Sequence, residues 1–177
     1  MQPGEYHLIV ARLEPENHVL EAVHGYTQSY ETKPLVVIGS APYSDWYIEK
    51  VKSSSDSRTR LSGAIYDQEL LNQLYGHCST YIHGHSVGGT NPSLLRAMGA
   101  GAPVLAFDCE FNREVTDNKA QYWGNATEFT NLINNLNTIN LANMAHQLQT
   151  RVATTYQWDA ITDQYEALIH KLADTKK

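Results

Sequence analysis

A glycine-rich loop that leads into a helix is the part of this sequence best suited to bind a ligand. Residues 84–90 follow a short strand pattern and contain three glycines, which let backbone amides approach a ligand without obstruction by a Cβ atom. Thr90, Asn91 and Pro92 then mark the start of a helix. Free amides at a helix N-terminus and the positive end of the helix dipole favour an anion. The residue types therefore predict a bound phosphorylated ligand, although many strand-to-helix turns of α/β domains bind nothing.

Arg12 is the second candidate for phosphate chemistry. It follows Tyr6–Ala11, a short apolar run typical of a buried parallel strand. In open α/β sheets ligands bind beyond the carboxyl ends of the strands, so a guanidinium at this point is suited to a phosphate. The alternative is a surface arginine that pairs with Glu14 or Glu16.

Residues 84–88, Gly-His-Ser-Val-Gly, also match the G-x-S-x-G motif of serine hydrolases, with Ser86 as the nucleophile. In those enzymes the helix begins directly after the serine, whereas here two glycines and a cap delay it. Their triad order requires an acid and then a histidine downstream, and only His146 and His170 are available, both in amphipathic segments. A phosphate-binding loop is therefore favoured over a hydrolase site.

Histidines and cysteines elsewhere do not predict a metal site or a catalytic thiol. His83 and His85 are two residues apart, near His77, but His85 lies in the loop and no carboxylate is close in sequence. Cys78 and Cys109 lack a C-x-x-C spacing and an obvious partner histidine. Neither a metal nor another cofactor is predicted.

The length of 177 residues, with a mass of 19.9 kDa, fits one well-buried α/β domain over residues 1–177. The net charge of -6 and the scattered basic residues argue against a nucleic-acid or membrane surface. The sequence has no hydrophobic signal run and no apolar span long enough for a membrane. With only two cysteines, a reducing, cytoplasmic setting is expected.

Strands alternate with helices through the first two thirds of the sequence, which predicts a parallel, doubly wound sheet flanked by helices. The predicted strands are 6–11, 34–39, 60–65, 79–83 and 103–107, with a short edge strand at Tyr122 and Trp123. Helices are predicted at 17–30, 46–51 and 67–76 and after the glycine-rich loop. In the helix 67–76, Leu70, Leu71 and Leu74 are expected to face inward. Three later helices, over 129–136, 141–152 and 158–172, form a tail that packs against the sheet or extends from it.

Four segments in this order are together similar to a known family. They are YHLIVARLEPENH, PLVVIGSAP, the run from Leu61 to Asp108, and YQWDAITDQYEALI. They resemble the C-terminal, donor-binding domain of retaining GT-B glycosyltransferases, in the group that includes glycogen synthase and sucrose-phosphate synthase. HSVGGTNPSLLRAMGAGAPVLAFD is most similar to a bacterial subgroup with rhamnosyltransferase-like members. The resemblance covers nearly the whole chain and implies a Rossmann-like parallel sheet, one half of a GT-B fold, with a helical C-terminal tail.

The resemblance implies a reaction and assigns roles to residues. A nucleotide-diphosphate sugar is expected at the carboxyl ends of the strands, with transfer of the sugar to an acceptor and retention of anomeric configuration. Arg12 matches the arginine of the family's GRL motif, which neutralises the diphosphate, and is the expected catalytic residue. Gly89, Thr90 and Asn91 match the loop amides and cap that meet the phosphates and sugar. Ile65 lies where backbone groups typically hold the base.

Several positions depart from the family pattern. The lysine that usually follows the arginine by five residues is Asn17. The family's two glutamates, separated by seven residues, fall on Gly88 and Arg96, and neither can accept a hydrogen bond through a carboxylate. Arg96 is instead expected to add positive charge near the diphosphate, and Gly88 to contribute backbone. Gly39, after the second strand, and His85, in the loop, complete the predicted ligand-binding residues.

A last departure is length, because GT-B enzymes need two Rossmann-like domains and this chain supplies one. The expected partner is an N-terminal acceptor-binding domain, in the same chain or a separate one. The predicted function is the donor half of a hexosyltransferase of polysaccharide biosynthesis, with negligible activity alone. The alternative is a non-catalytic module that binds a nucleotide sugar or a protein.

Overall fold

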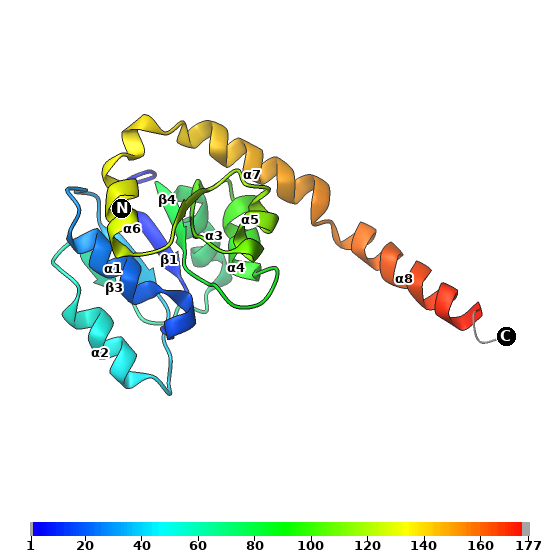
Figure 1. Cartoon of the computed structure of the whole chain (residues 1–177), viewed down its shortest axis with the longest axis horizontal. Coiled ribbons are helices and arrows are strands. Elements are labelled where there is room, and N and C mark those ends of the chain that lie inside the picture. Colours follow the sequence, from blue (N-terminus) through cyan, green and yellow to red (C-terminus); the bar gives the residue numbers. More distant parts are fainter. Residues whose placement is uncertain (1, 175–177) are drawn as a thin grey trace.

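Parallel strands joined by helices form the centre of the protein, whose computed structural model describes residues 2–174 (Figure 1). Within that range six strands make one parallel sheet in the order β3-β2-β1-β4-β5-β6. The strands are β1 His7–Val10, β2 Leu35–Ile38, β3 Thr59–Leu61, β4 Thr80–His83, β5 Val104–Phe107 and β6 Gln121–Trp123. The order reverses between β1 and β4, which is the arrangement of a Rossmann-like sheet.

Helices cover both faces of this sheet. On one face lie α1 Val19–Thr27, α2 Asp45–Ser53 and α6 Ala126–Asn134. On the other lie α3 Gln68–His77, α4 Pro92–Gly99, α5 Glu110–Thr116 and α7 Leu141–Thr155. Two short 3-10 turns, η1 Pro15–Asn17 and η2 Leu136–Thr138, precede α1 and α7 respectively. Successive side chains of a strand point to opposite faces, and both faces are covered, so they enter two different cores. Leu8 packs with α3 and α4, and Ile9 with α1.

The predicted elements differ from the structure in four places. The segment after Phe107 was not predicted to be helical, yet it forms α5, which is too short for a clear apolar period. The prediction that Leu70 faces inward is wrong, because Leu71 and Tyr75 occupy the buried side of α3 and Leu70 is 45% exposed. The third strand ends at Leu61 rather than Ile65, and Leu136 belongs to η2 rather than to α6.

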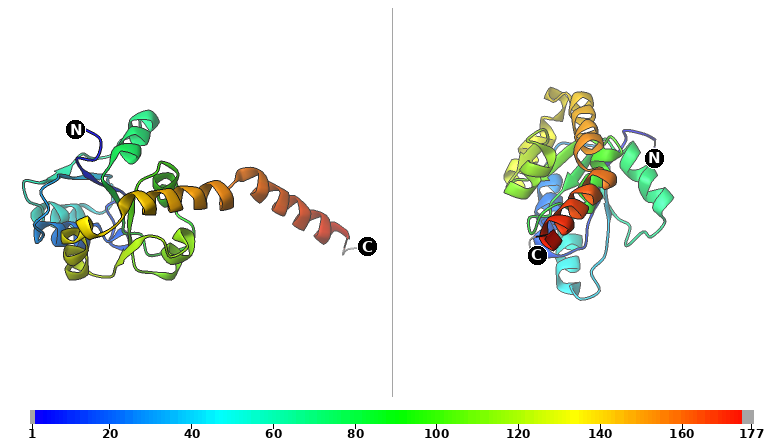
Figure 2. Two further views of the ribbon diagram at one scale, coloured as in Figure 1. Left: turned by 90° about the horizontal axis from the view of Figure 1, so that it is seen from above. Right: turned by 90° about the vertical axis from the view of Figure 1, so that its right-hand side faces the viewer.

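The C-terminal helices behave differently from each other. α7 packs on α4, where Gln149 Nε2 donates to Gly99 O at 3.1 Å and Val152 lies against Gly99. α8, Trp158–Asp174, extends away from the sheet and its covering helices, as Figure 2 shows from two further sides. None of the helices within residues 2–174 is long and apolar enough to cross a membrane.

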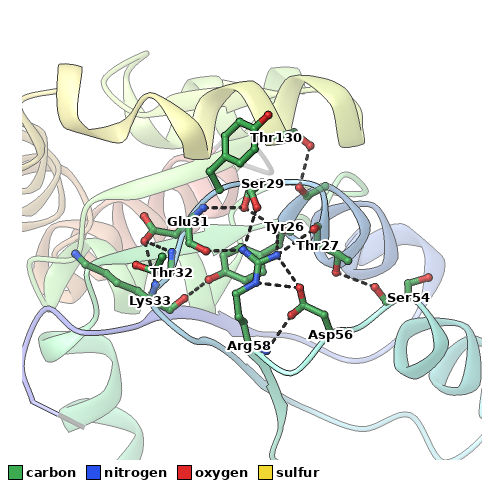
Figure 3. A network of polar contacts seen from close by, with 12 residues as sticks. Tyr26, Thr27, Ser29, Glu31, Thr32, Lys33, Ser54, Asp56, Arg58 and Thr130 are labelled. Carbon is green, nitrogen blue, oxygen red and sulfur yellow. Dashed lines mark hydrogen bonds and ion pairs between the residues drawn. The ribbon is translucent and has the colours of Figure 1, made fainter.

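A polar network stabilises the turns at the amino ends of the strands, at the edge of the sheet opposite the predicted site (Figure 3). Arg58, just before β3, pairs with Asp56 and donates to the carbonyl oxygens of the turn that joins α1 to β2. Those oxygens belong to Tyr26, Thr27, Ser29 and Glu31. The guanidinium thus satisfies carbonyl groups that the end of α1 leaves without helical partners.

Candidate functional site

A cavity of about 360 Å³ opens at the carboxyl ends of the strands, where the order reverses between β1 and β4. This is the position at which open α/β sheets bind ligands. Five of the residues predicted from the sequence line the cavity: Arg12, Gly39, Ile65, His85 and Asn91. They come from the segments that follow β1, β2, β3 and β4, so the sheet brings together residues far apart in the chain.

Two glycines allow the loops around the cavity to pass close to one another. Gly39 has a φ of +154°, and a Cβ atom there would collide with the carbonyl oxygen of Ala11. A Cβ at Gly84 would collide with the carbonyl oxygen of Asn17. Larger residues at either point would therefore push apart the chain segments that form the floor of the cavity.

The glycine-rich loop presents unoccupied backbone donors. Across residues 2–174, the amides of Gly88, Gly89 and Thr90 find no protein acceptor. Gly88 has a φ of +78°, which favours glycine at this point. Asn91 caps α4 with Oδ1, which accepts from Ser93 N at 2.9 Å and from Ser93 Oγ at 2.7 Å. The Ser93 amide is thus taken up by the cap, and the free donors are those of the loop itself.

Asn17 and Asn112 hold His85 in place beside these donors. The Asn17 side chain donates to Arg12 O at 2.9 Å, so its oxygen is left to accept from His85 Nδ1 at 2.8 Å. Nδ1 therefore carries the proton and Nε2 is an acceptor. Asn112 donates to the carbonyl oxygens of His85 and Phe107, both at 2.9 Å. The sequence interpretation treated Asn17 only as a missing lysine and did not single out Asn112, because neither belongs to a local motif.

His83 lies beneath the cavity and is only 3% exposed. Burial, and to a smaller degree the nearby His85, lower the pKa of His83 to about 3. Its Nδ1 lies 3.4 Å from the hydroxyl of Tyr81. His83 is therefore neutral at physiological pH and contributes no positive charge toward an anionic ligand.

Arg12 lines the cavity and also forms the surface ion pair that was its alternative interpretation. Its side chain is 71% exposed and lines the cavity, while Nη1 lies 3.4 Å from Glu14 Oε2. An exposed ion pair of this length contributes little, so the guanidinium can turn to a ligand at small cost. Its role at the diphosphate stays a prediction.

Arg96 lies outside the residues that line the cavity and is bound to α3. Its guanidinium donates to Gln68 Oε1 at 2.9 Å and to Asn72 Oδ1 at 2.7 and 2.9 Å, and it lies over the ring of Tyr75. These contacts give Arg96 a structural role that its sequence position did not indicate. A contact with the diphosphate remains a prediction for this residue, as it does for Gly88, Gly89 and Thr90, which continue the loop past the cavity lining.

The structure also gives Ser86 a histidine partner, which the sequence interpretation missed. His18 Nε2 lies 2.9 Å from Ser86 Oγ, although the two residues are 68 positions apart. The hydrolase fold requires a histidine downstream of the serine, so the sequence pattern did not point to His18. The switch between β1 and β4 brings an upstream histidine to the same place.

Other reactive groups in the described chain are poorly placed for chemistry. Residues 2–174 contain no cluster of three or more His, Cys, Asp or Glu side chains that could hold a metal ion. Burial raises the pKa of Cys78 to about 12, so its thiol stays protonated. Polar residues that line the cavity include Arg12, the Asn17–His85 pair, Asn91 and Ser93, and the free amides of Gly88, Gly89 and Thr90 lie in the adjoining loop.

Residues 5–143 match the family model described as glycosyl transferases group 1. The chain belongs to this family. The structure of HepE from Anabaena in complex with UDP superimposes on this group 1 chain with a TM-score of 0.82 at 17% identity, covering 96% of this chain and 49% of HepE. The complex of HepE with UDP-glucose gives a TM-score of 0.81 at 18% identity, covering 95% and 49%.

The C-terminal domain of LpcC from Francisella tularensis, a glycosyl transferase group 1 protein, gives a TM-score of 0.72 at 18% identity. It covers 89% of this chain and 89% of the domain. No curated protein matches the chain. These likenesses confirm the predicted fold, a Rossmann-like half of a GT-B glycosyltransferase with a helical tail. This group 1 chain spans about half the length of HepE.

Proposed function

We propose that this chain is the donor-binding domain of a retaining GT-B glycosyltransferase, nearest the rhamnosyltransferase-like members of the glycogen synthase group. It would bind a nucleotide-diphosphate sugar at the carboxyl ends of β1 and β4 and pass a hexosyl group to an acceptor in polysaccharide biosynthesis. The observation that carries the proposal is the row of free amides at Gly88, Gly89 and Thr90, next to a cavity at the strand-order reversal. HepE, similar in fold, has been solved with UDP and with UDP-glucose.

The proposed catalytic contribution is electrostatic. As the bond between sugar and diphosphate breaks, negative charge grows on the departing phosphate. Loop amides and the guanidinium of Arg12 would stabilise this charge without reorganising. The Nε2 lone pair of His85 suits a ligand hydroxyl rather than a phosphate oxygen, because a phosphate oxygen only accepts. A volume of about 360 Å³ lies within the range of small-ligand pockets.

The proposed partner is an N-terminal acceptor-binding domain, in the same chain or a separate one. α8 supports this because it carries large apolar side chains at helical spacing that remain exposed to solvent. They are Trp158, Tyr165, Leu168, Ile169 and Leu172, between 51% and 81% exposed. Such a stripe on a projecting helix suits contact with a second domain. Without that domain, transfer by this chain is expected to be negligible.

Calorimetric titration with UDP, GDP and their glucose conjugates tests the donor site. Binding of at least one of them is expected, and Arg12→Ala should weaken it about 10- to 150-fold, the effect of one hydrogen bond to a charged group. Arg151→Ala, a change on α7 far from the loop, is the matched control and should bind as the wild type does. Equal affinity of Arg12→Ala and the wild type would remove the role proposed for Arg12.

The second candidate is a non-catalytic module that binds a nucleotide sugar or a protein. It is favoured by Arg96, which stands where the family has a glutamate and is held by Gln68 and Asn72 instead. Sugar transfer in the presence of a supplied N-terminal domain distinguishes the two candidates. If the chain binds a sugar nucleotide but a supplied N-terminal domain of a group 1 enzyme never restores transfer, the non-catalytic function is the better account.

A further inference from the structure

The hydroxyl of Ser86 lies beside a histidine, which has a carboxylate on the other side of its ring, and donor binding does not use this arrangement. Ser86 Oγ is 2.9 Å from His18 Nε2, and the same hydroxyl can also donate to Glu16 O over a longer distance of 3.3 Å. The amide of Ser86 donates to Glu16 O at 3.0 Å, which fixes the backbone of the serine. The backbone of the serine is therefore fixed next to the imidazole of His18.

His18 is itself held in one orientation. Its ring stacks on Phe107 with centroids 3.8 Å apart and planes inclined by 2°. His18 Nδ1 lies 3.5 Å from Glu21 Oε1, on the side of the ring away from the serine. This distance is at the long end for a hydrogen bond. A negative charge there favours the tautomer with the proton on Nδ1 and leaves the Nε2 lone pair facing Ser86.

Glu21 is suited to remain charged in this position. Its interaction with His18 is the main cause of a lowered pKa, against a smaller opposing effect of burial. Glu21 and His18 are three residues apart, at the beginning of α1, so the helix geometry sets their spacing. The nucleophile thus comes from the loop after β4, and the base and the group that orients it come from the beginning of α1.

Backbone donors follow the serine directly. The amides of Gly88 and Gly89 have no acceptor within the described chain. A Cβ built on either glycine would meet no atom within 4 Å, so open space adjoins these amides. Donors of this kind beside a nucleophile can stabilise the oxyanion that forms when the serine attacks a carbonyl carbon.

We propose that Ser86, His18 and Glu21 form a nucleophilic triad that hydrolyses small acyl esters through an acyl-serine intermediate. Ser86 Oγ forms a bond to the carbonyl carbon while its proton moves to His18 Nε2. The bond from that carbon to the ester oxygen of the leaving group then breaks. His18 gives the proton to this oxygen, and the alcohol leaves. Water attacks the acyl group in the second half, gives its proton to His18, and releases the acid as the proton returns to Ser86. Glu21 is a positioning residue throughout.

A fluorophosphonate probe and p-nitrophenyl acetate, both used with the full 177-residue chain, test the triad. One adduct is expected, located on Ser86 by peptide mass spectrometry, together with release of p-nitrophenol. Ser86→Ala should abolish both signals. His18→Asn should slow labelling about 10²- to 10⁴-fold, the usual contribution of a general base. Asn tolerates the left-handed backbone of His18, whose φ is +45°. Glu21→Gln should slow it about 10- to 100-fold at a temperature at which the variant is still folded.

Matched controls separate the triad from general reactivity. Ser57→Ala and His24→Asn change exposed residues of the same types and should leave labelling at the wild-type rate. Thermal unfolding of each variant shows whether it folds. If Ser86→Ala does not fold, the site of the adduct in the wild-type chain still decides the question. Absence of an adduct on Ser86, or labelling of His18→Asn at the wild-type rate, would overturn the proposal.

Discussion

His85 Nδ1 donates to Asn17 Oδ1 over 2.8 Å and so ties the glycine-rich loop after β4 to the segment after β1. The same asparagine donates to Arg12 O, and the carbonyl oxygen of His85 accepts from Asn112. The relative position of the two ligand-binding segments therefore depends on a few buried amide groups. Asn17 is 6% exposed and Asn112 3% exposed, so water cannot easily replace either contact.

Asn17→Ala is expected to lower the free energy of unfolding by about 1–3 kcal/mol, because it leaves the partly buried His85 Nδ1 without its partner and removes one of the two hydrogen bonds to Arg12 O. It should also weaken nucleotide binding, since the loop loses its connection to the Arg12 segment. Urea denaturation and calorimetry measure the two effects. Asn131→Ala, at an exposed position of α6, is the control and should change neither. A variant with unchanged affinity would show that the loop is positioned by other contacts.

Gly88 and Gly89 make a matched pair within the loop. Gly88 has a φ of +78°, whereas Gly89 is outside the left-handed region and has open space around its missing Cβ. Gly88→Ala should therefore destabilise the fold by about 1–2 kcal/mol, the usual cost of a side chain in left-handed backbone. Gly89→Ala should leave stability within about 0.5 kcal/mol of the wild type.

The two alanine variants also probe the ligand site. A methyl group at Gly89 projects into the space that a bound diphosphate would occupy, so Gly89→Ala should weaken UDP binding while the protein stays folded. Thermal unfolding without ligand and calorimetry with UDP distinguish these outcomes. If Gly89→Ala binds UDP as tightly as the wild type, the loop amides are not the phosphate contact.

Much of the fold follows from local patterns in the sequence. Short apolar runs bounded by turn residues, such as Leu35–Ile38, are typical of buried parallel strands. The Asn91–Pro92 pair specifies where α4 begins. The apolar pattern did not predict α5, because this helix has only seven residues and its Phe111 is 39% exposed. It also failed at Leu70, because a run of adjacent leucines does not show which one the helix buries.

The sequence predicted the glycine-rich loop and several strand-end residues that line the cavity, but not the side-chain contacts that join separate segments. Gly88, Gly89, Thr90 and Asn91 are adjacent in the sequence, so the loop could be recognised as a set of donors. The partnerships of His18 with Ser86 and of Asn17 with His85 each span 68 residues and arise from the crossover between β1 and β4. Contacts between residues so far apart in the sequence cannot be predicted from the spacing of residues within a motif.

His83 predicts a pH dependence of stability. Its pKa is lowered to about 3 in the folded protein, so below about pH 6.5 the unfolded chain takes up a proton that the folded chain does not. The stability that the protein owes to neutral His83 is fully present above pH 6.5 and is lost as the pH falls toward 3. From this one group the free energy of unfolding should fall by up to about 1.4 kcal/mol per pH unit in that window.

The measurement is urea denaturation at pH 7, 6 and 5 for the wild type and His83→Leu. The variant lacks the titrating ring, so its stability should fall less steeply with decreasing pH, whatever its stability at pH 7. His24→Leu, at an exposed histidine on α1, should keep the wild-type slope. Parallel slopes for His83→Leu and the wild type would mean that His83 accepts a proton in the folded state.

The exposed apolar face of α8 predicts that this helix contributes little to the stability of the domain. Leu168 and Leu172 are 51% and 58% exposed, and α8 extends away from the sheet (Figure 1). Leu168→Lys with Leu172→Lys should therefore change the free energy of unfolding by less than about 0.5 kcal/mol per site. Leu148→Lys on α7 is the contrasting variant, because Leu148 is fully buried and a charge there should prevent folding. Urea denaturation compares the two. A large loss of stability in the α8 variant would show that α8 packs on the domain itself, and the stripe would then no longer support a partner domain.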